Sequence, residues 1–104
     1  MTGVQELISS MPSQYSLSTM PADRQQHAVL LHRLRLEGAE SQSLHLNWAR
    51  CDPATFSLWL VFADRRGSLG VITSVLSELD IDISKAAAFS THDGIAIDTF
   101  TVSR

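Results

Sequence analysis

The sequence contains a single cysteine, Cys51, which excludes an internal disulfide and any zinc site built from several cysteines. No apolar run approaches the roughly 18 residues that a membrane-spanning helix requires. The N-terminus also lacks a basic region followed by an apolar stretch, so no secretory signal is predicted. From these absences we expect a cytoplasmic protein that makes no membrane contact.

The sequence has no excess of basic residues either. Its formal net charge is -3, whereas a nucleic-acid binder normally carries a basic surface that neutralises phosphates. The densest basic cluster, at positions 32–35, is short and more typical of the solvated face of a helix. We therefore expect no nucleic-acid partner. With 104 residues, the chain is long enough for one domain.

Motifs of catalysis and metal binding are missing as well. There is no glycine-rich nucleotide loop and none of the sequence motifs of a kinase domain, so no catalytic residue is assigned. Asp98 has no acid-base partner at a suitable spacing, and we expect it on the solvent face of a sheet. The histidines are not spaced as metal ligands, so we expect no metal site, no cofactor and solvated positions for His27, His32, His45 and His92.

What the sequence does contain is a clear alternation of helical and extended patterns. Residues 1–20 are polar with one short apolar repeat, and we expect a flexible N-terminal arm with about two helical turns that end at Pro12. Asp93-Gly94 predicts a tight hairpin turn. The periodicities predict helices at 22–36 and 68–79 and strands at 44–50, 56–63, 81–90 and 95–102.

This order predicts an α+β domain over residues 21–104. Two helices on one face of a four-stranded antiparallel sheet would bury all the apolar stripes. The elements are those of a ferredoxin-like βαββαβ fold, but with the last helix and strand moved to the front, which gives the order αββαββ. The move is geometrically reasonable because the first and fourth strands of that sheet are antiparallel neighbours.

The segment "FADRRGSLGVI" joins a buried strand to the second helix. Gly67 and Gly70 permit close backbone approach, and the first amides of a helix attract anions and carboxylates. The spacing matches neither a P-loop nor a dinucleotide-binding turn. The loop is therefore a candidate cradle for a small ligand, with the alternative that its glycines only allow tight packing.

The run "WLVFADRRGSLGVITSVLSELDIDISKAAAFSTHDGIAIDTFTV" resembles an ACT domain. The resemblance lies in the Asp-x-x-Gly turn, the Leu-rich helix and the hairpin "AFSTHDGIAIDTFTV". It is most similar to the ACT domain of plant and algal serine/threonine/tyrosine protein kinases of the STY type. In that family the turn usually reads Asp-x-Pro-Gly, whereas Arg66 stands at the proline position here.

The resemblance implies a regulatory domain that binds an amino acid or similar small ligand, often as a homodimer, and controls an attached kinase domain. Carried onto this sequence, the ligand loop would comprise Asp64, Arg65, Arg66, Gly67, Ser68, Leu69 and Gly70. The facing side of the site would be Asp82, Ile83 and Ser84 at the start of the third strand.

Two alternatives to this function stay open. The domain could be a protein-protein interaction or dimerisation module without a metabolite ligand, because exposed strand edges favour self-association. An RNA-binding sheet could use Trp48 and Trp59 for base stacking, but the last strand has Asp98 and one aromatic residue where basic and aromatic residues are needed. Packing in the core or at an interface is favoured for both tryptophans.

Overall fold

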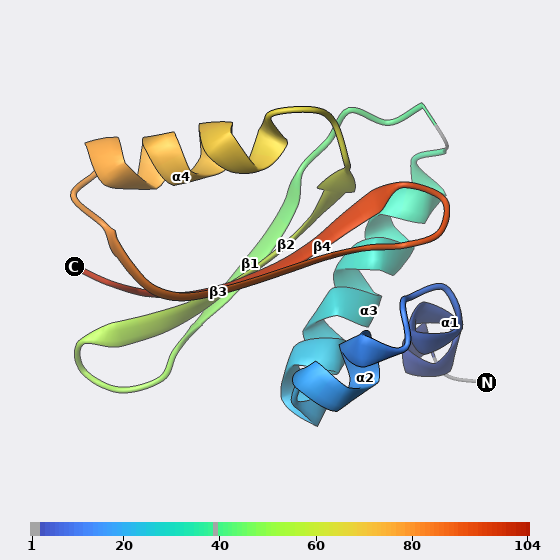
Figure 1. Ribbon diagram of the computed structural model, residues 1–104, viewed down its shortest axis with the longest axis horizontal. Coiled ribbons are helices and arrows are strands. Elements are labelled where there is room, and N and C mark those ends of the chain that lie inside the picture. Colours follow the sequence, from blue (N-terminus) through green and yellow to red (C-terminus); the bar gives the residue numbers. More distant parts are fainter. Residues whose placement is uncertain (1–2, 39) are drawn as a thin grey trace.

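The computed structural model describes residues 3–38 and 40–104 (Figure 1). The described chain forms four helices and one sheet, and no helix in it is long and apolar enough to cross a membrane. Along the chain the elements are α1 (Gly3–Ser9), α2 (Gln14–Ser18), α3 (Pro21–Leu36), β1 (His45–Arg50), β2 (Thr55–Ala63), α4 (Ser68–Glu78), β3 (Asp82–Ser90) and β4 (Ile95–Ser103).

The sheet has four strands in the order β1-β2-β4-β3, and every neighbouring pair is antiparallel. The predicted four-stranded antiparallel sheet and its two hairpins are therefore confirmed. In the second hairpin Gly94 has a φ of +85°, a conformation that side chains with a Cβ rarely adopt. This antiparallel sheet and its strand order are compatible with a ferredoxin-like fold.

The two long helices lie on opposite faces of the sheet, which corrects the prediction that both cover one face (Figure 1). On β2, Trp59 and Val61 pack in the cluster that contains the leucines of α3. Leu60 and Phe62 point the other way and pack with Ile72 of α4. Because β2 carries apolar side chains on both faces, each face needs its own helix. We call these the α3 face and the α4 face.

The N-terminal segment, expected as a flexible arm, packs against α3 in the structure. The short helix α1 forms as predicted, and the segment buries Leu7, Met11 and Tyr15 in the cluster on the α3 face. His92 donates its backbone N–H to the carbonyl of Ser10 at 2.9 Å, which ties the segment to the β3–β4 turn. Residues 3–20 thus contribute to the core.

Strand β3 contains an irregularity that decides which of its side chains reach the α4 face. The register shifts between Ile83 and Lys85. Ile83 packs in the cluster on the α4 face, and after the shift Ala88 and Ser90 face the same side, opposite Asp98 and Ala96 of β4. The irregularity thereby puts the Ser90 hydroxyl beside the loop that follows β2.

Candidate functional site

The predicted ligand loop, residues 64–70, connects the end of β2 to the start of α4. Asp64 is fixed on both sides, since its backbone N–H donates to the Gly94 carbonyl at 2.9 Å and its Oδ2 accepts from the Ser90 Oγ at 2.9 Å. Gly67, with a φ of +84°, precedes the first helical residue. Ser68 is the first residue of the helix.

The second predicted part of the site, Asp82 to Ser84, lies at the other end of α4. The helix has 11 residues, and at a rise of about 1.5 Å per residue it separates the two parts by roughly 16 Å. Ser84 donates its hydroxyl to the Thr101 carbonyl at 3.1 Å. Within one chain the structure therefore does not bring Asp82, Ile83 and Ser84 to the loop.

Asp98 is the candidate site residue that the sequence analysis missed. Asp98 was expected on the solvent-exposed face of the sheet, but it is only 3% exposed and its side chain faces α4. In the sheet it is flanked by Leu60 of β2 and Ala88 of β3. Burial, and then the nearby carboxylate of Asp64, raise the pKa of Asp98 to about 7.

The sequence did contain a signal for this position. In "IAIDTFTV" the side chains of Ala96, Phe100 and Val102 share a face with Asp98, because successive strand residues alternate between faces. All three of these neighbours are buried. The alternation that directs them inward also directs Asp98 inward.

Asp98 borders a cavity of about 150 Å³ beneath the start of α4. We call this cavity the Asp98 pocket; its lining is formed by Phe62, Asp64, Leu69, Ala88, Phe89, Ser90, Ala96 and Asp98. At about 30 Å³ per water molecule, it has room for a very small organic group together with water. Over residues 3–38 and 40–104, no side chain donates a hydrogen bond to the Asp98 carboxyl group.

The start of α4 contributes hydrogen-bond donors next to this pocket. Leu69 lines the pocket and belongs to the first turn of α4. The backbone amides of Leu69 and Gly70 have no backbone acceptor within the described chain, as expected for the first turn of a helix. Arg65 and Arg66 are exposed and form no ion pair with any described residue. Carboxylates and amides therefore lie close together here.

A second buried ionisable group, His27, has a different environment. It was expected at the surface but is fully buried, and Nδ1 lies 2.6 Å from the Tyr15 Oη while Nε2 lies 2.7 Å from the Thr99 Oγ1. Burial lowers the pKa of His27 to about 4, so the ring is neutral at pH 7. Because both ring nitrogens have partners, this chain of hydrogen bonds serves packing between α2, α3 and β4.

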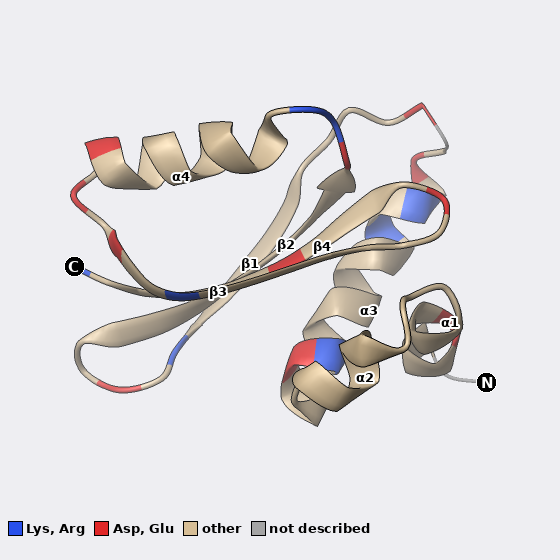
Figure 2. Ribbon diagram, in the orientation of Figure 1, with Lys and Arg blue, Asp and Glu red and all other residues tan. Residues whose placement is uncertain are grey.

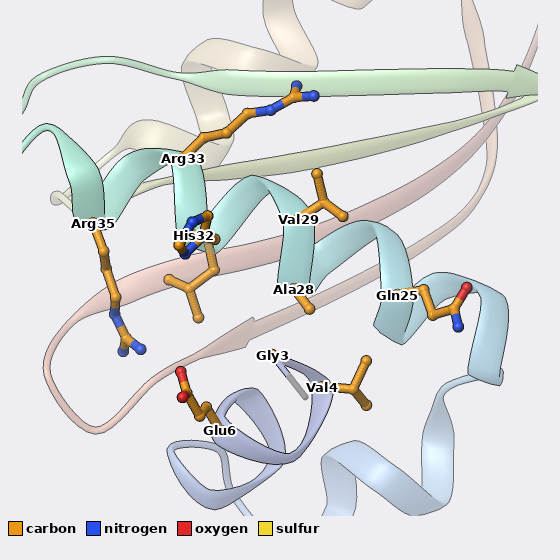
Figure 3. Close-up of a pocket in the computed structure, with 10 residues that line it drawn as sticks. Gly3, Val4, Glu6, Gln25, Ala28, Val29, His32, Arg33 and Arg35 are labelled. Carbon is orange, nitrogen blue, oxygen red and sulfur yellow. The ribbon is translucent and has the colours of Figure 1, made fainter. Parts of the chain in front are cut away.

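A larger cavity of about 540 Å³ lies between α1 and α3 (Figure 3). Val4, Ala28 and Val29 form its apolar part, and the charged side chains of Glu6 and Arg35 stand at one end. It contains none of the predicted site residues, and its polar side chains are at the surface. This cavity therefore offers no buried polar group that could recognise a ligand, in contrast to the Asp98 pocket.

Within residues 3–38 and 40–104, no three His, Cys, Asp or Glu side chains gather closely enough to hold a metal ion. Cys51 is exposed in the β1–β2 turn. No family model, no curated protein and no solved structure matches the chain.

Proposed function

We propose that this chain is a non-catalytic regulatory domain that binds a small amino-acid-like ligand in the Asp98 pocket. The observation that carries the proposal is Asp98, a residue only 3% exposed whose carboxyl group borders the pocket beside a second carboxylate and accepts no hydrogen bond from a described side chain. A buried, unpaired ionisable group destabilises a fold, so its presence in a pocket favours a role in binding.

A positively charged ligand group would supply the hydrogen-bond donors that the Asp98 carboxyl group lacks. A primary ammonium group has three donors, which suits the carboxylates of Asp98 and Asp64 and the hydroxyl of Ser90. Its charge would remove the repulsion between the two carboxylates and favour ionised Asp98. Binding should therefore strengthen as the pH rises through about 7, the pKa of Asp98 in the free protein.

The ligand's carboxylate would lie at the start of α4. The amides of Leu69 and Gly70 and the positive end of the helix dipole favour a negative group there. Arg65 and Arg66 add two cations in the same loop. A zwitterionic amino acid carries both groups at a short separation, and the volume of the pocket favours a small side chain.

The resemblance to ACT domains supports the same function and extends it. It implies that the ligand signal passes to an attached catalytic domain, which we propose to be a protein kinase of the STY type in the cytoplasm. Two residues of the loop that the resemblance assigns to the ligand, Asp64 and Leu69, line the Asp98 pocket. Asp82 to Ser84 would join the site only from a second copy of the chain.

The test is a titration of the ¹⁵N-labelled chain with free amino acids, followed by the amide signals of Leu69, Gly70 and Asp98. Glycine, alanine and serine should give saturable shifts at these positions. Acetate and methylamine, each of which has one of the two charged groups, should bind at least tenfold more weakly. Asp98→Asn should abolish the shifts, whereas the exposed control Asp80→Asn, at the far end of α4, should change the affinity less than twofold.

The proposal is wrong if no amino acid produces saturable shifts at millimolar concentration at pH 8. It is also wrong if Asp98→Asn binds as well as the original chain. The double variant Arg65→Ala/Arg66→Ala separates the two ends of the ligand, since it should weaken glycine binding and leave methylamine binding unchanged.

A further inference from the structure

The loop before α4 contains a serine with two arginines close before it. The order is Arg65-Arg66-Gly67-Ser68-Leu69, so the cations lie two and three positions before the hydroxyl group and an apolar residue follows it. No other serine or threonine in the sequence has a basic residue at either of these two positions. In Figure 2 the loop before α4 is blue, whereas the helix itself has no charged residue until its last position. The loop is therefore a local basic segment in a chain of net charge -3.

The groups of this segment are accessible and have no partners of their own. Ser68 is half-buried, but within residues 3–38 and 40–104 its hydroxyl group forms no hydrogen bond. Arg65 and Arg66 are exposed and form no ion pair with a described residue. At Gly67, a Cβ atom would meet nothing within 4 Å, so the turn is open on its outer side. A second protein can therefore reach the hydroxyl group and both cations.

The first turn of α4 can open without disturbing the core. Leu69 is 45% exposed, and Ile72 is the first residue of the helix that packs against the core cluster on the α4 face. No side chain caps the start of the helix, and its first three residues include a serine and a glycine, which are weak helix formers. Asp64, in contrast, is fixed by two hydrogen bonds. Local opening can therefore begin after Asp64 and stop before Ile72, which leaves an extended segment around the serine.

We propose that Ser68 is a phosphorylation site for a serine kinase whose substrate groove is acidic. Kinases select substrates by their charge pattern, and Arg65 and Arg66 would form charge-assisted hydrogen bonds with carboxylates of such a groove. In the reaction, the bond between the γ-phosphorus of ATP and the β,γ-bridging oxygen breaks and a bond from that phosphorus to the Ser68 Oγ forms. ADP leaves, and the hydroxyl proton passes to the catalytic base of the kinase.

The surroundings of Ser68 also suit the product. A phosphoserine has a charge of about −1.5 to −2 at pH 7 and three acceptor oxygens. The amides of Leu69 and Gly70 have no backbone acceptor within the described chain, and a negative group is favourable in the first turn of a helix. Arg65 and Ser68 border the same cavity of about 260 Å³, so Arg65 can pair with the phosphate after transfer. The two carboxylates of the site border the separate Asp98 pocket.

A regulatory consequence rests on the proposed function. The phosphate would occupy the amides and the arginines that we assign to the carboxylate of the amino acid ligand. Phosphorylation of Ser68 should therefore weaken binding in the Asp98 pocket, and the kinase would act as a second input to the same site.

The first test is phosphorylation of the whole folded chain by a purified kinase of this class, the catalytic subunit of cyclic-AMP-dependent protein kinase, with ATP and Mg²⁺. Mass spectrometry should find one phosphate, on Ser68. Ser68→Ala should take up none. The matched control Ser74→Ala removes an exposed serine of the same helix that has no arginine before it, and it should be phosphorylated at the original rate.

The second test concerns recognition by the two arginines. Arg65→Ala/Arg66→Ala should lower kcat/KM for the kinase about 100-fold, because two charge-assisted contacts are lost. Arg33→Ala/Arg104→Ala removes two exposed arginines elsewhere and should leave kcat/KM unchanged. An arginine double variant at 65 and 66 that is phosphorylated as fast as the original chain would overturn the proposal.

A peptide of residues 62–72 shows whether the fold or the motif decides the outcome, since it presents the same residues without the helix. Both the peptide and the folded chain should be phosphorylated. A folded chain that takes up no phosphate on Ser68 overturns the proposal, whether or not the peptide is modified.

The regulatory consequence is measured separately, by glycine titration of the phosphorylated chain. Its affinity for glycine should fall about tenfold, because a charged contact at the carboxylate is lost, whereas methylamine binding should not weaken. If the unmodified chain binds no glycine, the proposed function is wrong and the assignment of Ser68 still stands. Equal glycine affinity with and without the phosphate would contradict the regulatory consequence alone.

Discussion

The two faces of the sheet differ in whether their buried polar side chains have hydrogen-bond partners. On the α3 face, the buried polar side chains have partners: His27 has one at each nitrogen, and the Trp59 Nε1–H donates to the Asp23 Oδ1 at 2.8 Å. On the α4 face, Asp98 accepts no hydrogen bond from a described side chain, and apolar side chains such as Trp48, Val71 and Val75 are exposed. The α3 face stabilises the fold, whereas the α4 face has the features of a binding surface.

The largest expected difference between the faces is in packing. Leu30 is fully buried on the α3 face, and we expect Leu30→Ala to lower the free energy of unfolding by about 4 kcal/mol. Leu76, the one buried residue of α4, has half-exposed neighbours that can relax, so Leu76→Ala should cost about 2 kcal/mol. Urea denaturation measures both. Equal losses at the two positions would contradict the comparison.

The next difference between the faces is in how stability depends on pH, and His27 determines it on the α3 face. Its pKa is about 4 in the folded protein, against about 6.5 in an unfolded chain. Between these values the unfolded chain binds a proton that the folded chain does not, so stability falls as the pH falls. The contribution of His27 should decrease by up to about 3 kcal/mol from pH 7 to pH 4.

The measurement is urea denaturation of the original chain and of His27→Gln at several pH values in this range. His27→Gln keeps a polar group but has no titration, so the difference between the two proteins should shrink steadily towards pH 4. A difference that does not depend on pH would show that His27 does not stay neutral in the folded state.

Asp98 should respond to pH in the opposite direction. Its folded pKa of about 7 is raised above the ordinary value, so its contribution to stability is present at pH 4 and is lost as the pH rises through 7. Asp98→Asn should therefore stabilise the fold by about 2 kcal/mol at pH 8 and change it little at pH 4. Thermal unfolding at both pH values tests this, with the exposed Asp82→Asn as the control. A destabilised Asp98→Asn at pH 8 would mean that Asp98 is a structural residue.

The sequence predicted the local elements of the fold but not how the elements pack against one another. The six long elements were placed within about two residues because their periodicities are local properties of the chain. Which helix covers which face was mispredicted, because "FSLWLVFA" is apolar on both faces and does not say which helix it contacts. Tertiary contacts with α3 decided the placement of residues 3–20.

For the candidate site, the loop from Asp64 to Gly70 was predicted from its residue types and its position before a helix, and the structure places it between β2 and the first turn of α4. Asp98 was missed because it was judged without its neighbours along the strand. The neighbour that raises its pKa, Asp64, is 34 positions away in the sequence, and only the pairing of β2 with β4 brings the two together. A long-range electrostatic interaction of this kind has no local signal.

The alternation of β4 connects the two faces of the molecule. Asp98 borders the pocket on one face, while the next residue, Thr99, holds His27 and through it Tyr15 on the other. A ligand that shifts the backbone at Asp98 must also shift Thr99, because one rigid peptide unit joins them. The N-terminal segment, which is anchored by Tyr15, is therefore connected through His27 and Thr99 to the strand that borders the pocket.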